Sequence, residues 1–244
     1  MGAISAVRTT EGIDATRLIK KMVALQLHRG SELFGVSTSK EHVITSSLDE
    51  FSKLKNSNSA IAYNLMKIDN WDEPQPVRSN GLSYIIECDY AEFYSSPTGF
   101  LKFLHGDPYE CLRKIITKWD GQYAVAVLKG EEIYAARDPV GLKPLYYAYS
   151  NGIDALASEK KALWGIGLTS AFSFPPGHVW RLGENSPSPV MEINSQKRFV
   201  QRTDKVMSKL TELLEEAVYE RTHRLDRIGI CFSGGVDSAI ITIL

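Results

Sequence analysis

The fold is decided by the run Ala136-Arg137-Asp138-Pro139-Val140-Gly141-Leu142-Lys143-Pro144-Leu145-Tyr146-Tyr147. An arginine and an aspartate followed by a proline and a glycine suit a tight corner that ionic hydrogen bonds stabilise. We therefore interpret Arg137 and Asp138 as residues that hold a turn, not as a reacting pair. Strands are expected on both sides of this turn.

Short strand-like segments surround the run. Four of them cover residues 122–128, 132–136, 145–149 and 154–157. The turns Lys129-Gly130 and Asn151-Gly152 between them predict an antiparallel meander. The remaining pattern predicts strands at 3–8, 33–36, 42–45, 59–68 and 82–87, and helices at 13–27, around 109–118 and from 203 onward.

The run resembles the N-terminal domain of glutamine-dependent asparagine synthetases. The resemblance extends through Ala157-Ser158-Glu159-Lys160-Lys161-Ala162-Leu163, and is supported by His28-Arg29-Gly30, Trp119-Asp120-Gly121-Gln122-Tyr123-Ala124 and Pro175-Pro176-Gly177-His178. It implies the class II glutamine amidotransferase fold, an α+β four-layer αββα sandwich of the N-terminal-nucleophile type. His28-Arg29 also has a simpler interpretation, as cations that complement a helix end.

The resemblance also implies a domain order. An amidotransferase-like domain would occupy residues 1–195 and a linker residues 196–203. Residues 204–244 would begin a Rossmann-like α/β ATP pyrophosphatase (asparagine synthase) domain, so that the synthetase part of this chain is expected to be truncated.

A second motif, Ile228-Gly229-Ile230-Cys231-Phe232-Ser233-Gly234-Gly235-Val236-Asp237-Ser238, lies near the end of the sequence. It is typical of a buried strand, a Ser/Gly turn and a helix start, which together offer backbone N–H groups to an anion. No Gly-Lys-Ser/Thr follows, so it is not of the Walker type. A turn followed by a helix cap is the simpler alternative.

The family resemblance gives this motif a role. It implies that Ser233, Gly234, Gly235, Asp237 and Ser238 bind the pyrophosphate of ATP, with Mg²⁺ neutralising charge. ATP then adenylates a substrate carboxylate, and ammonia or an amine displaces AMP. The implied small-molecule substrates are therefore ATP, a carboxylic acid, and ammonia or an amine.

The nucleophile expected from the resemblance is missing. Family members use a cysteine that follows the initiator methionine, with its own α-amino group as the base. Gly2 occupies that position and has no nucleophilic atom, so no catalytic residue is assigned and glutamine hydrolysis is predicted to be absent. We also predict a degenerate glutamine pocket: Asn64 replaces a carboxylate-binding arginine, and Tyr90, Ala91 and Glu92 replace an Asn-Gly-Glu, with only Glu92 retained.

Three interpretations remain open at this level. The chain could come from an ATP-dependent ligase that uses free ammonia or a substrate amine, as β-lactam synthetases do, and be inactive alone. It could instead be a non-catalytic pseudo-glutaminase that scaffolds, dimerises or senses a ligand. Alternatively, Gly2 could reflect an engineered or miscalled start, against which the changed pocket residues argue.

Composition excludes several other classes. A net charge of −1 gives no electrostatic footprint for nucleic acid or an anionic membrane, and no apolar run approaches the roughly 20 residues of a membrane span. Cys88, Cys111 and Cys231 lack metal-ligand spacing, so we predict no metal site, three small buried apolar residues, and a reducing, cytoplasmic location. The oligomeric state stays open, with a homodimer among the alternatives.

Overall fold

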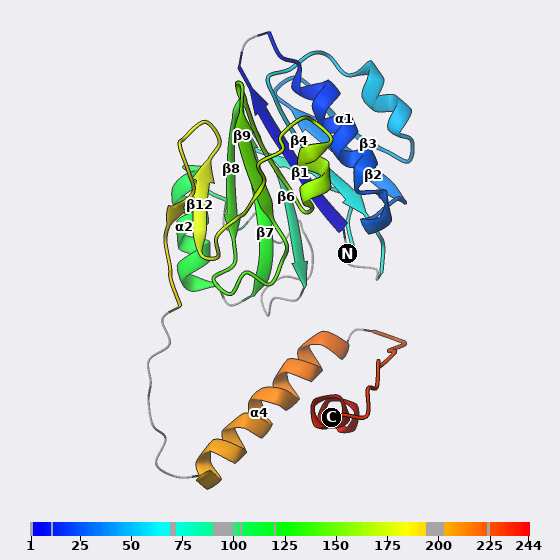
Figure 1. Ribbon diagram of the computed structural model, residues 1–244, viewed down its shortest axis with the longest axis vertical. Helices are drawn as coiled ribbons and strands as arrows, with labels where there is room; N and C mark the ends of the chain where they lie inside the picture. Colours follow the sequence, from blue (N-terminus) through cyan, green and yellow to red (C-terminus); the bar gives the residue numbers. More distant parts are fainter. Residues whose placement is uncertain are drawn as a thin grey trace. The chain divides into compact units, whose positions relative to one another are not determined.

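The computed structural model describes residues 2–10, 12–68, 72–89, 100, 102, 104–119, 121–193, 203–223 and 225–244. The chain divides into two compact units, Met1–Ile193 and Asn194–Leu244. Each is described below by itself. The first contains two antiparallel sheets with helices outside them (Figure 1), and the second contains two helices.

The strands of the described residues form two sheets, and every strand pair is antiparallel. The first sheet has the order β11 (Phe172–Ser173), β9 (Tyr146–Ser150), β10 (Ile153–Ala157), β1 (Gly2–Thr9), β4 (Ser59–Leu65), β2 (Leu33–Thr38) and β3 (His42–Thr45). The second has the order β13 (Ser188–Pro189), β12 (His178–Arg181), β8 (Glu132–Arg137), β7 (Gln122–Lys129), β6 (Leu82–Asp89) and β5 (Val77–Ser79). The helical segments of the first unit are α1 (Ala15–Leu25), η1 (Leu27–Arg29), η2 (Leu48–Lys53), α2 (Pro108–Lys118) and α3 (Lys160–Trp164).

Three hydrophobic clusters define the layers. One lies between α2 and the second sheet, one between α1, α3 and the first sheet, and one between the two sheets. Figure 1 shows α1 and α2 on opposite sides of the paired sheets. The first unit is therefore the four-layer αββα sandwich that the sequence predicts.

Strand alternation decides which side chains face the space between the sheets. Ile4 of β1, Tyr63 of β4 and Ile85 of β6 belong to the inter-sheet cluster, whereas Val7 and Ala62 belong to the cluster under α1. Because successive side chains on a strand point to opposite faces, Glu87 shares the face of Ile85, and Asn64 lies on the face opposite to Tyr63.

Local signals account for the helix starts. The Asp14 side chain accepts a hydrogen bond from the Thr16 N–H at the start of α1, and Asp107 accepts one from the Glu110 N–H at the start of α2. Pro108 occupies the first turn of α2, where the missing N–H of a proline costs nothing. Both helices bury one apolar face against a sheet.

The prediction of one meander is wrong. Strands β7 and β8 pair in the second sheet, whereas β9 and β10 pair in the first. The chain passes from the second sheet to the first in the corner between β8 and β9. Side-chain hydrogen bonds, and not strand pairing, hold this corner.

The corner itself is confirmed as a structural turn. The fully buried Asp138 carboxylate accepts hydrogen bonds through Oδ1 from the N–H groups of Val140, Gly141 and Leu142. The Arg137 guanidinium donates to the carbonyl oxygens of Gly141 and Lys143, and also to that of Phe174. The two side chains thus supply hydrogen-bond partners for backbone N–H and C=O groups of a segment that pairs with no strand among the described residues.

The second unit contains α4 (Thr203–Thr222) and α5 (Val236–Ile243). The predicted strand over residues 228–232 is not formed, and Cys231, predicted to be buried, is exposed. A strand needs a neighbour for its backbone groups, and the described part of this unit supplies none. In the first unit Cys111 is buried and Cys88 half-buried. Among the described residues, no helix is both long and apolar enough to cross a membrane.

Candidate functional site

Gly2 begins the central strand β1, opposite Leu65 of β4. A Cβ atom placed on Gly2 would come closer than 3.0 Å to the Asn64 carbonyl oxygen and to the Tyr63 hydroxyl. Real Cβ contacts essentially never reach that distance. The position therefore lacks a nucleophilic atom and also lacks the space for a side chain.

A buried polar cluster, formed by Gly2, Tyr63, Glu87 and Lys143, fills this end of the inter-sheet space. The Gly2 N–H donates to Glu87 Oε1 over 3.1 Å, and the Tyr63 hydroxyl donates to Glu87 Oε2 over 2.6 Å. Lys143 Nζ lies 3.5 Å from Glu87 Oε1, and the side chains of Lys143 and Glu87 are only 6% and 2% exposed. Two strands of the first sheet and the corner segment thus each contribute one group that contacts the Glu87 carboxylate of the second sheet.

Strand alternation and the corner explain how Glu87 and Lys143 reach the cluster. Glu87 lies near the end of β6 on the face that Ile85 fills deeper in the core. Lys143 is held by the corner, because Arg137 Nε donates to the Lys143 carbonyl oxygen over 2.6 Å and the Lys143 N–H donates to Asp138 Oδ2 over 3.4 Å. The corner therefore positions the lysine that faces Glu87.

The electrostatics of the cluster fix the protonation state of Tyr63. Burial, followed by the charge of Glu87 and the hydrogen bond to it, raises the pKa of Tyr63 well above its ordinary value of 10. Tyr63 therefore stays a neutral hydrogen-bond donor. A neutral phenol, a backbone N–H and a lysine–glutamate ion pair stabilise one another and offer no activated nucleophile.

Asn64 is not part of this cluster. Its side chain is fully buried on the α1 side of the sheet, where Nδ2 donates to the carbonyl oxygens of Val23 and Gly30 over 3.2 and 3.1 Å. Its Oδ1 has no hydrogen-bond partner in the structure. The amide thus anchors the end of α1 to β4 and is turned away from Gly2. Tyr90, Ala91 and Glu92, the other predicted pocket residues, lie outside the described residues.

Sequence reasoning missed Glu87, Tyr63 and Lys143. One signal was available, because Glu87 is a single carboxylate after a run of apolar residues in a strand buried on both faces. A charge in such a strand needs a partner. The sequence alone did not indicate that the partner is Lys143, 56 residues later.

The Ser/Gly loop is exposed and forms the start of α5. Ser233 Oγ lies 3.1 Å from Ser238 Oγ, and Ser238 Oγ donates to the Gly235 carbonyl oxygen over 2.9 Å. Gly234 has a φ of +80°, and a Cβ atom there would meet nothing within 4 Å. Gly235 is the N-cap without a side-chain capping bond, and Asp237 lies in the first turn. The five residues predicted to bind pyrophosphate thus lie in one loop, and no other atoms crowd its backbone at Gly234.

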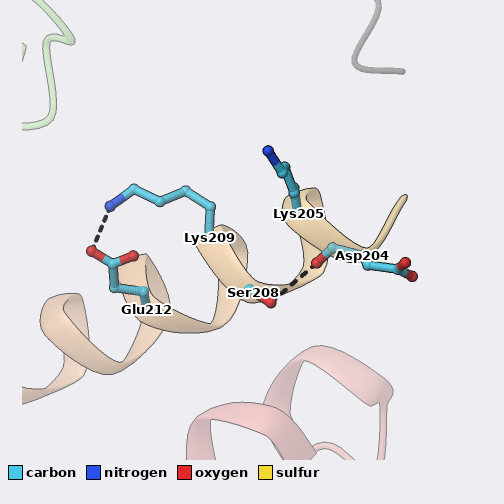
Figure 2. A pocket seen from close by; sticks show the side chains of 5 residues that line it. All are labelled: Asp204, Lys205, Ser208, Lys209 and Glu212. Carbon is cyan, nitrogen blue, oxygen red and sulfur yellow. Dashed lines mark hydrogen bonds and ion pairs between the residues drawn. The ribbon is translucent and has the colours of Figure 1, made fainter. Parts of the chain in front are cut away.

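A shallow depression also runs along α4. Figure 2 shows the residues that line it: Asp204, Lys205, Ser208, Lys209 and Glu212. Lys209 Nζ pairs with Glu212 Oε1 over 2.5 Å, and Ser208 Oγ donates to the Asp204 carbonyl oxygen over 3.1 Å. These contacts stay within one exposed helix face, and the depression shows no arrangement suited to catalysis.

Comparison with known families agrees with the two-part organisation. A glutamine amidotransferase domain model matches residues 96–165, and an asparagine synthase model matches residues 209–244. The putative glutamine-hydrolysing asparagine synthetase 1 of Methanocaldococcus jannaschii is 23% identical over 279 residues, covering 100% of this chain and 51% of the relative. A probable asparagine synthetase of Dictyostelium discoideum is 26% identical over 256 residues, covering 93% of this chain and 42% of the relative. The chain thus spans about half the length of these relatives.

Solved structures support the fold. Glutamine phosphoribosylpyrophosphate amidotransferase from B. subtilis aligns with a TM-score of 0.63 at 17% identity, over 76% of this chain and 48% of its own. A structure described as the allosteric regulatory enzyme of purine biosynthesis also aligns with a TM-score of 0.63, at 15% identity, over 78% of this chain and 49% of its own. The two family models match in the same order along the chain, and the aligned relatives are asparagine synthetases, so the chain is similar to glutamine-hydrolysing asparagine synthetases, with a glutamine amidotransferase domain followed by part of a synthetase domain.

Proposed function

We propose that this protein is an asparagine-synthetase-like, ATP-dependent amide-forming ligase whose amidotransferase domain does not hydrolyse glutamine. The observation that carries the proposal is the packing around Gly2. The Tyr63 hydroxyl and the Asn64 carbonyl oxygen occupy the space that a residue-2 side chain requires.

The buried cluster supports the same conclusion. Glutamine hydrolysis in this family needs a nucleophile next to a base. At Gly2, the N–H donates to Glu87, which Tyr63 and Lys143 also contact. Tyr63 cannot move aside without breaking its 2.6 Å hydrogen bond to a buried carboxylate, and leaving such a charge under-satisfied is costly.

A ligase without glutaminase activity needs another nitrogen source. We infer that it uses free ammonia or an amine, and that a carboxylic acid is the acceptor. We propose the domain limits 1–195, 196–203 and 204–244 for the amidotransferase-like domain, the linker and the synthetase part. The three cysteines are all free thiols, which fits the reducing cytoplasm.

The Ser/Gly loop fits the phosphates of ATP. Ser233 and Ser238 supply hydroxyls, Gly234 and Gly235 leave the backbone open, and Asp237 could hold Mg²⁺ at the start of α5. When bound, ATP supplies the activation of the carboxylate. The residues of this chain would bind and orient the phosphates.

A Gly2→Cys variant tests the packing directly. We expect it to form no glutamate from glutamine, and to lose about 1–3 kcal/mol of unfolding free energy because the new side chain overpacks the site. Urea denaturation and a glutamate assay measure both results. Gly229→Cys is the matched control, since a Cβ there meets nothing within 4 Å. Glutaminase activity in a stable Gly2→Cys protein would contradict the proposal.

A titration with magnesium pyrophosphate tests whether the Ser/Gly loop binds phosphate. In ¹H–¹⁵N NMR spectra we expect the amides of residues 233–238 to shift on titration, with weak affinity on the order of 1 mM because one loop supplies only a few kcal/mol. A Ser233→Ala/Ser238→Ala variant should lose the shifts, whereas Ser208→Ala on α4 should keep them. Unchanged loop amides in the parent protein would contradict a phosphate site.

The buried cluster also favours a second candidate function, that of a non-catalytic scaffold. An amidotransferase-like domain whose nucleophile position is filled by the Tyr63 hydroxyl and the Asn64 carbonyl oxygen can serve the ligase by stabilising it. Omitting glutamine from the assay of the full-length ligase would then leave its rate unchanged. A variant that destabilises the cluster would instead lower the amount of folded ligase.

A further inference from the structure

A shallow cleft, open to solvent, lies on the first unit and borders the buried polar cluster at Arg29. It has a volume of about 460 Å³ and is formed by η1, the start of β9, and the segment from the end of β10 through α3. The lining residues that matter here are Arg29, Tyr146, Glu159, Lys160, Lys161 and Trp164. The volume lies within the range of small-molecule sites.

The charge of this cleft is unbalanced. Among the described residues that line it, three cationic side chains, Arg29, Lys160 and Lys161, face a single carboxylate, Glu159, although the whole chain carries a net charge of −1. The Glu159 carboxylate is shared: Oε1 lies 2.6 Å from His28 Nε2 and 3.7 Å from Arg29 Nη1, and Oε2 lies 3.4 Å from Lys161 Nζ. One carboxylate cannot neutralise this set, so the cleft has a surplus of positive charge.

Glu159 stays ionised and holds these groups in place. Burial opposes its ionisation, but the hydrogen bonds and charges of His28 and Lys161 outweigh that effect and lower the pKa of Glu159. Arg29 is fixed from behind, because its Nε donates to the Gly2 carbonyl oxygen over 2.9 Å and the side chain is 19% exposed. The cationic groups are therefore partly pre-organised, which reduces the entropic cost of binding an anion.

Aromatic rings border the same cleft. Trp164 exposes 52% of its surface, whereas Trp119 and Trp180 expose 7% and 0%. Lys160 Nζ lies 5.4 Å from the centroid of the Tyr146 ring. An exposed indole beside cationic groups can stack on a planar ring while the cations contact an attached oxyanion.

We propose that this cleft binds a small molecule that carries a phosphate or carboxylate group next to a planar ring. The oxyanion contacts Lys160, Lys161 and the terminal nitrogens of Arg29, and the ring stacks on Trp164. The site shares no residue with the Ser/Gly loop, and it touches the buried cluster through the hydrogen bond from Arg29 to the Gly2 carbonyl oxygen. Binding there does not require that glutamine hydrolysis or ATP binding takes place.

Tryptophan fluorescence of the full chain tests the proposal, because Trp164 is exposed. The probes are AMP (phosphate and ring), phenylacetate (carboxylate and ring), ribose 5-phosphate (phosphate alone) and adenosine (planar base alone). We expect saturable quenching by AMP, by phenylacetate, or by both, and at least tenfold weaker responses to ribose 5-phosphate and adenosine. The response to AMP relative to phenylacetate distinguishes a phosphate ligand from a carboxylate ligand.

Three variants locate the binding. Trp164→Phe should abolish the quenching, and Lys160→Ala/Lys161→Ala should weaken the affinity at least tenfold without changing the urea midpoint. Ser233→Ala/Ser238→Ala should leave the quenching unchanged, which separates this cleft from the proposed ATP loop. The proposal is overturned if neither ring-bearing anion gives saturable quenching, or if the double lysine variant binds as tightly as the parent protein.

Discussion

A Lys143→Met variant is expected to lose about 3–5 kcal/mol of unfolding free energy, because it leaves the buried carboxylate of Glu87 without its ion-pair partner. Of the contacts made by the described residues, Glu87 would keep the hydrogen bonds from the Gly2 N–H and the Tyr63 hydroxyl. Total stabilities of natural domains are about 5–15 kcal/mol, so the loss is large. Urea denaturation followed by circular dichroism measures it.

A double-mutant cycle separates the ion pair from simple packing. Glu87→Gln alone should also destabilise, since it leaves the Lys143 ammonium buried. The combined variant should cost less than the sum of the single losses by about 1–3 kcal/mol, because it removes both charges of the buried pair together. Strictly additive losses would contradict an ion pair at this place.

An exposed pair provides the matched control. Lys53 Nζ lies 2.6 Å from Glu50 Oε1, but the two side chains are 72% and 44% exposed. Lys53→Met should therefore cost less than about 1 kcal/mol. A similar loss for Lys53→Met and Lys143→Met would show that burial does not govern the effect.

Asp138→Ala is expected to produce a loss of comparable size, about 3–5 kcal/mol. Removing the carboxylate leaves several backbone N–H groups of the corner without an acceptor, and each hydrogen bond to a charged group contributes about 1.5–3 kcal/mol. The N–H of Tyr123 also donates to Asp138 Oδ2 over 3.2 Å, so the variant disturbs β7 as well as the corner. Thermal unfolding of the purified variant measures the change.

An Asp138→Asn variant tests how much of this loss of unfolding free energy depends on the negative charge. Asp138→Asn keeps one acceptor oxygen but directs an NH₂ group toward backbone donors, so its loss should lie between zero and that of alanine. Asp154→Ala is the control, since Asp154 makes a 3.5 Å contact with a partly exposed Arg8 and should cost less than about 1 kcal/mol. An Asp138→Ala protein as stable as this control would contradict a structural role for the corner.

The sequence was sufficient for those parts of the fold that depend on local chemistry. Helix α2 follows from Asp107 and Pro108, and the corner follows from Arg137 and Asp138, because each carries its hydrogen-bonding partners within a few residues. The assignment of β7 to β10 to one meander failed for the opposite reason. Turn residues specify hairpins, but which sheet each hairpin joins depends on contacts between distant segments.

The candidate site was predictable only in part. The absence of a nucleophile at Gly2 is evident from the sequence, since glycine has no side chain. The contribution of Tyr63, Glu87 and Lys143 was not, because these residues meet only after the two sheets pack face to face. The strand predicted over residues 228–232 failed because its buried character depends on neighbouring strands that the described residues do not include.

The most direct test of the central claim is glutamine hydrolysis by the unmodified chain. The protein is incubated with glutamine, and glutamate is quantified by mass spectrometry against a protein-free blank. Because Gly2 supplies no nucleophile and its surroundings are filled, we predict no glutamate above the blank. Glutamate formation that rises in proportion to protein concentration and disappears in a Cys88→Ser variant would contradict the account.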